Sequence, residues 1–157
     1  MAVMMQLKRT DDAALVATLN NPIHEHHLQL APAFFAPYNH ASMQAAFSEM
    51  MARDDYHFFT AEVDGDTVGY VCFQERVSEA NAFRQAVRTL YVHQISINPE
   101  AKRRGYGRLV MEEVERYAIA HGFPSIELDY WSVNEAAAAF YSEIGFQPKR
   151  QFVVKHL

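Results

Sequence analysis

The amino-acid sequence predicts one α/β or α+β domain, a mixed sheet of about six strands and about four helices in packed layers. Short runs rich in β-branched and aromatic residues alternate with segments of helical period along the whole chain. No repeat, low-complexity tract or linker interrupts this alternation. A chain of 157 residues can bury enough surface for an independent core, so residues 1–157 are expected to form a single domain.

The first part of the chain predicts one strand and two helices. Residues 3–8 are expected to form the strand, and Thr10-Asp11-Asp12 carries side chains that can cap the helix after it. We expect this helix to end near Asn20-Asn21-Pro22, because proline breaks the helical hydrogen-bond pattern. The chain then stays irregular until a second helix over residues 41–51.

The middle of the chain predicts a hairpin and a further strand. Residues 57–63 and 67–77 are rich in strand-forming residues and flank Asp64-Gly65-Asp66, whose glycine accepts a positive φ without steric cost. This pattern indicates an antiparallel pair. After a polar stretch, residues 87–97 predict the next strand.

The last part of the chain predicts two helices and two strands. Pro99 ends the preceding strand, and an apolar period after Gly107 indicates a helix that stops at Gly122. The remaining elements are a strand over residues 125–131, a helix from its cap Asn134 to Ile144, and a final strand over residues 151–155.

Composition and charge exclude several classes of function. A formal net charge of -5 argues against a broad basic surface for nucleic acid and is compatible with a cationic amine as substrate. The single cysteine, Cys72, permits no internal disulfide and is expected in the core. Residues 1–9 lack the charge order of a secretory signal, and no apolar run reaches about 18 residues. We therefore expect a cytoplasmic protein that does not enter a membrane.

A basic loop with two glycines lies where a strand ends and a helix begins. Its sequence is Lys102-Arg103-Arg104-Gly105-Tyr106-Gly107-Arg108. Free backbone N–H groups and the positive end of the helix dipole converge there, which is typical of phosphate binding. The spacing matches neither the dinucleotide fingerprint G-x-G-x-x-G nor the nucleoside triphosphate loop G-x-x-x-x-G-K-[ST]. A solvated helix N-terminus is the alternative interpretation.

Two segments resemble the GNAT superfamily of acetyl-CoA-dependent N-acetyltransferases. Residues 95–107, ISINPEAKRRGYG, look like its acetyl-CoA loop, [QR]-x-x-G-x-[GA] after a strand, with Lys102 in place of Gln or Arg. Residues 125–146 are similar to the family's segment of strand, asparagine, helical tyrosine and Gly-Phe pair. The resemblance implies a mostly antiparallel sheet of about six to seven strands and acetyl-CoA as co-substrate.

The same resemblance implies roles for individual residues. Backbone groups of Ile95 and Ile97 would pair with pantetheine, and the N–H of Ile95 or Ser96 would polarise the thioester carbonyl. Tyr141 aligns with the family tyrosine that protonates the departing thiolate, although aromatic packing is its structural alternative. Helix capping alone also explains Asn134. The residues implied to bind acetyl-CoA are Ile95, Ser96, Ile97, Lys102, Arg103, Arg104, Gly105, Tyr106, Gly107, Arg108, Asn134 and Tyr141.

A general base is predicted on the strand that precedes the loop. An amine with a pKa of about 10.4 must lose a proton before it can attack a thioester. Strand alternation predicts His93, Ile95 and Ile97 on one face, which would bring the imidazole near the thioester. Glu127 and Asp129 on the next strand are competing candidates. Packing within the strand is the alternative role for His93.

The histidine-rich segment His24-Glu25-His26-His27 lacks the H-E-x-x-H spacing of a helical zinc site, so we predict a solvated loop and no metal. In the GNAT superfamily this region lines the acceptor pocket. By that analogy, the residues near the acceptor would be His24, His27, Phe34, Phe35 and Tyr38.

The sequence as a whole predicts an enzyme that transfers an acetyl group from acetyl-CoA to a primary amine by direct attack in a ternary complex. The acceptor would be a small molecule or a peptide, with no nucleic-acid partner, and a homodimer is in keeping with the resemblance. The alternative is a domain of the same fold that binds an acyl-CoA as a sensor or interaction module without turnover. The presence of Tyr141 favours catalysis.

Overall fold

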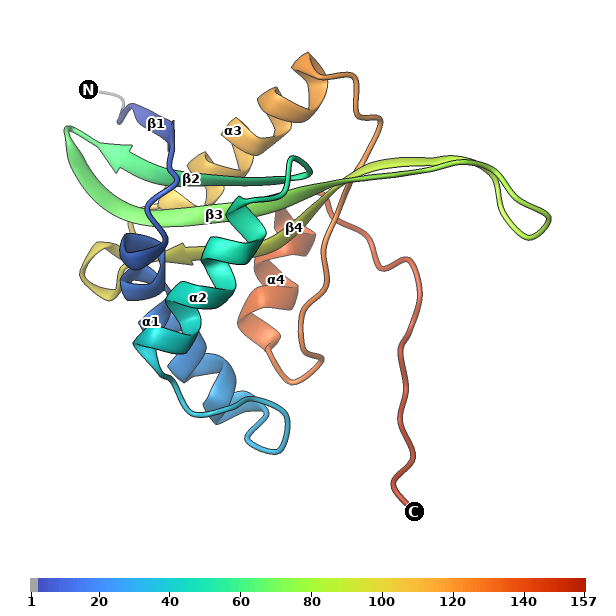
Figure 1. The fold of residues 1–157 in the computed structure, drawn as a ribbon, viewed down its shortest axis with the longest axis horizontal. Helices are drawn as coiled ribbons and strands as arrows, with labels where there is room; N and C mark the ends of the chain where they lie inside the picture. The colour runs from blue at the N-terminus through green and yellow to red at the C-terminus, as the bar shows by residue number, and fades with distance from the viewer. Residues whose placement is uncertain (1–2) are drawn as a thin grey trace.

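The computed structural model describes residues 3–157, which form one sheet with helices on both faces (Figure 1). Its five strands are hydrogen-bonded in the order β1-β2-β3-β4-β5. They are β1 (Met5–Arg9), β2 (Tyr56–Val63), β3 (Asp66–Ser78), β4 (Val87–Ile97) and β5 (Ile126–Glu127). Neighbouring strands are antiparallel except β4 and β5, which are parallel. The predicted mixed, mostly antiparallel sheet is confirmed, with fewer strands than expected.

Helices cover both faces of the sheet, and each face has its own hydrophobic core. They are α1 (Ala13–Leu30), α2 (His40–Met51), α3 (Tyr106–Ala120) and α4 (Glu135–Glu143), and a 3₁₀ turn, η1 (Pro99–Ala101), leads from β4 to α3. Phe47 of α2 packs on one face with Phe58 and Tyr70. Val110 of α3 and Phe140 of α4 belong to the larger core on the other face. None of the helices within residues 3–157 is both long and apolar enough to cross a membrane.

Local turn and cap chemistry agrees with the prediction. Asp64 and Gly65 have φ of 52° and 83°, so they form the two-residue turn whose twist matches the hairpin of β2 and β3. The side chains of Asp12 and Asn134 each accept a backbone hydrogen bond at the start of α1 and α4.

Gly69 allows β3 to approach β4 closely. A Cβ atom at this position would lie 2.0 Å from the backbone oxygen of Ser96. That distance is far below van der Waals contact, so no side chain fits there. Position 69 therefore requires glycine, and the close approach fixes the end of β4 that precedes the basic loop.

The predicted end of the first helix is wrong, because α1 continues through Pro22. Proline removes one backbone hydrogen bond from the helix, but tertiary contacts hold the helix on both sides of it. Buried Asn20 donates to the hydroxyl of Tyr70 on β3 at 2.9 Å. His24 packs edge-on against Phe35, with ring centroids 5.8 Å apart. These contacts outweigh the local break.

Of the two last predicted strands, one is shorter and one is absent. Only Ile126 and Glu127 of the predicted strand 125–131 pair with β4, and residues 151–155 form no strand, so that prediction is wrong. A strand needs a neighbouring strand that pairs with its backbone N–H and C=O groups. Within residues 3–157, residues 128–131 and 151–155 have no such neighbour. Residues 147–157 are exposed and run away from the sheet (Figure 1).

Cys72 lies buried in the core between the sheet and α1, as predicted. Burial raises the pKa of its thiol. A thiol that stays protonated in an apolar core is a packing residue and not a nucleophile.

Candidate functional site

The basic loop forms the N-terminal end of α3 and leaves its backbone donors free. The N–H groups of residues 103–108 donate to no backbone oxygen within residues 3–157, and the first such bond is from Leu109 to Gly105 at 3.3 Å. Gly105 caps the helix without a side-chain hydrogen bond. Consecutive free donors at the positive end of a helix dipole are suited to an anion such as a diphosphate.

Two residues of this loop have a left-handed backbone. Arg103 has a φ of 65° and Gly105 a φ of 77°. This conformation costs roughly 1–2 kcal/mol for a residue with a Cβ, and such residues turn successive N–H groups toward one side, as in anion-binding nests. A Cβ added at Gly105 would meet no atom within 4 Å, so the space in front of the loop is open.

The edge of β4 beside the loop is also open. β5 pairs with β4 only at Leu90 and Tyr91. Beyond these pairs, residues 92–97 have no strand partner on that side within the described chain, and residues 128–131 leave β4 instead of extending the ladder. The two strands therefore enclose a gap that widens toward the basic loop.

The direction of the hydrogen bonds shows which groups of β4 face this gap. Asn98 donates its backbone N–H to the backbone oxygen of Val68 in β3 at 2.7 Å. Because successive N–H groups along a strand point to opposite sides, Ser96 directs its N–H toward β3, whereas Ile95 and Ile97 direct theirs into the gap. The gap is thus lined by backbone groups that a peptide-like ligand could pair with.

The predicted alternation of His93 with Ile95 and Ile97 is wrong. The pairing of β3 with β4 shifts register and skips His93, which forms a β-bulge. A one-residue slip moves every following side chain to the opposite face. Ile95 and Ile97 pack against the core beneath α3, as expected, whereas His93 lies on the other face, where it contacts Gln74.

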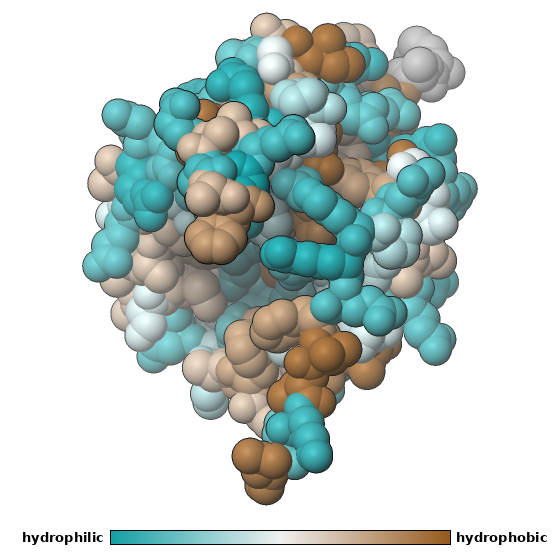
Figure 2. Space-filling view, turned by 90° about the vertical axis from the view of Figure 1, so that its right-hand side faces the viewer, coloured by the Kyte–Doolittle hydropathy of each residue, from teal (hydrophilic) through white to brown (hydrophobic). Residues whose placement is uncertain are grey.

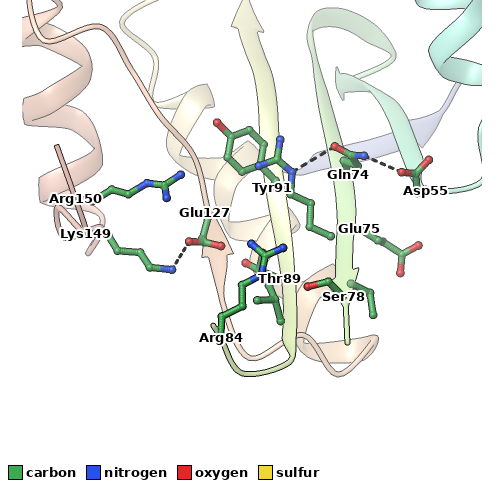
Figure 3. A pocket seen from close by; sticks show the side chains of 13 residues that line it. Asp55, Gln74, Glu75, Ser78, Arg84, Thr89, Tyr91, Glu127, Lys149 and Arg150 are labelled. Atoms are coloured by element: carbon green, nitrogen blue, oxygen red, sulfur yellow. Dashed lines mark hydrogen bonds and ion pairs between the residues drawn. The ribbon is translucent and has the colours of Figure 1, made fainter. Parts of the chain in front are cut away.

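A chain of hydrogen bonds fixes the proton on His93. Its Nε2 lies 2.8 Å from Oε1 of Gln74, and Nε2 of Gln74 donates to Oδ2 of Asp55 at 2.7 Å (Figure 3). Hydrogen bonds from Arg53 and Gln74 lower the pKa of Asp55, so this carboxylate only accepts. Gln74 must turn its amide nitrogen to Asp55 and its oxygen to His93. His93 therefore donates from Nε2, and the neutral ring carries its lone pair on Nδ1.

The surroundings of His93 favour this neutral form. Burial lowers the pKa of the imidazole, and the guanidinium of Arg76 lowers it further. The ring stacks on Tyr56, with centroids 5.3 Å apart. At pH 7 the imidazole is able to accept a proton.

The two competing carboxylates are already engaged. Glu127 accepts a hydrogen bond from Nζ of Lys149 at 2.7 Å, and this bond lowers the pKa of Glu127. Asp129 accepts from the hydroxyl of Tyr91. A carboxylate that is held by a cation is a weaker proton acceptor than a free one, so the ion pair with Lys149 makes Glu127 a weaker base.

Tyr141 of α4 lies among aromatic rings with its hydroxyl unengaged. The phenol stacks on Tyr130 at 5.7 Å and meets Phe140 and Phe146 edge-on at 5.1 and 5.6 Å. Its hydroxyl makes no hydrogen bond within residues 3–157. Burial raises the pKa of Tyr141 to about 12, so the group stays protonated at neutral pH and is available as a donor.

The residues expected near the acceptor form an aromatic cluster against Trp131. Phe34 and Phe35 meet Trp131 with centroids 5.0 and 5.6 Å apart, and His27 stacks on Phe35 at 5.3 Å. Residues 24–27 lie in α1 and not in the predicted loop. Burial lowers the pKa of His27, and the neighbouring histidines add to this effect. Within residues 3–157 no group of three or more His, Cys, Asp or Glu could hold a metal ion.

An open hollow of about 460 Å³ lies beside the His93 network (Figure 3). Gln74 and Tyr91, two contacts of His93, form part of its wall. The charged side chains around it are of both signs: Asp55, Glu75, Glu127, Arg76, Arg84, Lys149 and Arg150.

Sequence reasoning alone misses Gln74 and Asp55. One feature of the sequence could have pointed to Gln74, which is a polar residue directly after the apolar strand segment 69–73. A polar side chain that is partly buried in a sheet needs a hydrogen-bond partner. No local pattern identifies Asp55 as that partner, because the two residues meet only through sheet pairing.

Solved structures share this fold, and two of them are described here by their similarity. The tetramutant of BH1408 from Bacillus halodurans matches with a TM-score of 0.87 and 22% identity, over 98% of this chain and 99% of that one. The aminoglycoside N-acetyltransferase AAC(6')-Iy, in complex with CoA, matches with a TM-score of 0.67 and 16% identity, over 100% and 97%. At these identities the likeness shows that the fold is shared and no more.

The family follows from the sequence comparison. The family model described as Acetyltransferase (GNAT) family matches residues 23–146. MJ1207, an uncharacterized N-acetyltransferase of Methanocaldococcus jannaschii, is 33% identical over 104 residues, 66% of this chain and 44% of that protein. The N-alpha-acetyltransferase RimI of Mycobacterium tuberculosis is 30% identical over 103 residues, 66% of this chain and 60% of that protein. The chain belongs to the GNAT acetyltransferase family and spans about half the length of these curated relatives.

Proposed function

We propose that this protein transfers the acetyl group of acetyl-CoA to a primary amine of a small molecule or peptide, by direct attack in a ternary complex. The observation that carries the proposal is the run of free N–H groups at residues 103–108 beside the open edge of β4. The CoA bound to AAC(6')-Iy and the activity named for RimI support it. Bound acetyl-CoA would supply the acetyl group as an activated thioester.

The residues of the loop and of the β4 edge fit such a ligand. The free N–H groups would hold the diphosphate, and exposed basic side chains would add charge. The backbones of Ile95 and Ile97 would pair with the amide-containing pantetheine arm. Asn134 uses its side-chain oxygen to cap α4, so its amide N–H₂ group remains for the ligand. The basic side chains are those of Lys102, Arg103, Arg104 and Arg108.

Each chemical requirement of acetyl transfer has one residue in this arrangement. The N–H of Ile95 would polarise the thioester carbonyl, since the N–H of Ser96 points toward β3. Nδ1 of His93 would take the proton from the attacking amine, which would enter through the hollow beside Gln74. Tyr141 would donate a proton to the departing thiolate.

The direct test is to offer acetyl-CoA and a panel of primary amines to the purified protein. Thiol release together with an acetylated product identified by mass is the expected result. A protein that binds acetyl-CoA but releases no thiol with polyamines, aminoglycosides, amino acids or peptide N-termini would be the non-catalytic sensor of the alternative interpretation.

Replacement of Gly105 by valine is expected to weaken acetyl-CoA binding at least tenfold, about 1.4 kcal/mol. Valine is strained at the φ of 77° found at Gly105, and its side chain would occupy the space in front of the free N–H groups. Isothermal titration calorimetry measures the affinity. Gly122→Val is the matched control, because Gly122 has a φ of 74° and equally open surroundings at the other end of α3. Equal affinity of both variants would remove the loop from the site.

His93→Gln is expected to lower kcat/KM at pH 7 by roughly tenfold to a hundredfold. Because burial lowers the pKa of His93, the imidazole loses its proton below pH 6.5, and the base is present at higher pH. The wild-type kcat/KM should therefore fall as the pH drops through a value below 6.5, and the variant should lack this limb. If the variant keeps the limb at the same pH, His93 is not the base and Glu127 is the next candidate.

A further inference from the structure

The hollow beside His93 lies between two segments that project from the domain. β3 and β4 extend as a two-stranded ribbon past Tyr56, where β2 begins, and residues 147–157 leave the sheet on the same side (Figure 1). Figure 2 shows this side of the molecule, with a hollow between the two segments and hydrophilic side chains along its rim. Residues of both segments line the hollow, so a ligand that enters it meets side chains of both.

The acidic side chains that line the hollow already have partners. Asp55 accepts two hydrogen bonds from the guanidinium of Arg53, at 3.0 and 2.8 Å. Glu127 is engaged in its ion pair at 2.7 Å. Glu75 turns to the opposite face of the sheet, where its carboxylate lies 2.9 Å from Nε2 of His57. No carboxylate of the lining is therefore left to balance a further cation.

Three arginines of the lining have no ion pair within residues 3–157, and they are Arg76, Arg84 and Arg150. Figure 3 shows Arg84 and Arg150 extending toward the hollow from the ribbon and from the segment after α4. Asp129, which accepts the hydroxyl of Tyr91 beside the hollow, is one carboxylate against these three guanidinium groups. The hollow therefore has an excess of positive charge, which attracts an anion.

Arg76 is held in one orientation beside the proposed base. Its guanidinium lies over the ring of Tyr91, 3.6 Å from the centroid, and this cation–π contact orients its plane. Its Nε lies 3.5 Å from Oε1 of Gln74, the oxygen that also contacts His93. The two terminal nitrogens of Arg76 make no hydrogen bond within the described part of the chain. A guanidinium with a free edge binds a carboxylate or a phosphate through two parallel hydrogen bonds.

We propose that the amine acceptor of this protein carries an acidic group, a carboxylate or a phosphate, and that Arg76 binds this group while the amine reaches Nδ1 of His93. The inference rests on the proposed acetyl transfer and names the class of its acceptor. Because Gln74 lies between the two protein groups, the amine and the acid are several bonds apart in the acceptor. Amino acids and small phosphorylated amines have this chemistry.

The same charges disfavour acceptors that are only cationic. A polyamine or an aminoglycoside would bring several ammonium groups beside Arg76, Arg84 and Arg150, where no carboxylate of the lining is free to pair with them. Like charges at short range repel each other and reject such a ligand. The hollow would therefore select the acidic acceptor both by attraction to its acid and by repulsion of its cationic competitors.

The first test compares acceptors that differ in the acidic group. Lysine is paired with cadaverine, and phosphoethanolamine with ethanolamine, and thiol release from acetyl-CoA gives kcat/KM for each. In at least one pair the acidic member is expected to be favoured roughly tenfold or more, and the pair that shows this preference tells carboxylate from phosphate. Thiol release without a preference in either pair would overturn the inference. If no amine releases thiol, the proposed acetyl transfer fails, and the binding test below decides the inference.

The second test assigns the preference to Arg76. Arg76→Gln is expected to abolish the preference within the pair, mainly through a higher KM for the acidic member, and Arg76→Lys should restore part of it by keeping the charge. The assays are run at pH 8, where His93 is neutral with or without the nearby guanidinium that lowers its pKa. Arg116→Gln is the matched control, because it removes an exposed guanidinium of α3 that pairs with Glu113. An Arg76→Gln protein that keeps the wild-type preference would overturn the inference.

The binding test needs no turnover. Protein saturated with CoA is titrated with lysine, cadaverine, phosphoethanolamine and ethanolamine in a calorimeter. The acidic member of at least one pair is expected to bind, and Arg76→Gln should weaken its binding by roughly tenfold to a hundredfold, whereas Arg116→Gln should not. Equal affinities within both pairs, or equal affinities of the wild type and Arg76→Gln, would overturn the inference whether or not the protein transfers acetyl groups.

Discussion

Replacement of Tyr141 by phenylalanine is expected to lower kcat by roughly 10²–10⁴ while leaving the affinity for acetyl-CoA nearly unchanged. The hydroxyl would act on charge that develops only as the thiolate leaves, so its loss affects the transition state and not the bound ground state. Its pKa of about 12 keeps the phenol protonated in any assay near neutral pH. Steady-state kinetics and calorimetry with acetyl-CoA measure the two quantities separately.

The fold should not be affected, because the hydroxyl of Tyr141 makes no hydrogen bond within residues 3–157. Tyr130→Phe is the matched control, since its ring stacks on that of Tyr141 at 5.7 Å. That variant loses a neighbouring hydroxyl with no assigned role, so its kcat should stay near the wild-type value. A Tyr141→Phe protein with wild-type kcat would take this tyrosine out of the mechanism.

Gly69→Ala is expected to lower the free energy of unfolding by about 3 kcal/mol, at the upper end of the cost of an overpacked core. The added methyl group would lie 2.0 Å from the backbone oxygen of Ser96, and backbone cannot rotate away as a side chain does. Strand β4 would have to move at the residues that precede the basic loop, so acetyl-CoA binding should weaken as well. Urea denaturation measures the loss of stability.

Gly65→Ala separates the steric effect from the backbone effect. Gly65 has a φ of 83° and no atom within 4 Å of an added Cβ, so only conformational strain of about 1–2 kcal/mol is expected there. If both alanine variants lose the same stability, the close approach of β3 to β4 is not the reason for glycine at position 69.

Elements with local causes could be predicted from the sequence. The turn at Asp64 and Gly65 needs only residues that accept positive φ, and the cap at Asn134 needs only a short side chain with an oxygen. The free donors at residues 103–108 follow from a helix that starts after a glycine. In each case the determining contacts lie within a few residues of the chain.

Elements that depend on distant partners could not be predicted. The path of α1 through Pro22 depends on Asn20 meeting Tyr70, fifty residues away. The short β5 and the missing strand at residues 151–155 depend on whether a neighbouring backbone is present. Propensity alone does not supply that neighbour.

The sequence by itself determined the class of fold, the basic glycine loop at the start of α3 and the place of Tyr141 in α4, because each depends on contiguous residues. Only the tertiary structure decided the state of His93. The β-bulge that turns its side chain away from Ile95 and Ile97 arises in the pairing of β3 with β4. The proton on Nε2 is set by Gln74 of β3 and, through it, by Asp55 in the turn before β2. The alternation of residue types along a strand does not show where a β-bulge inserts an extra residue. The tautomer of a histidine is fixed by the hydrogen-bond partners of its ring nitrogens.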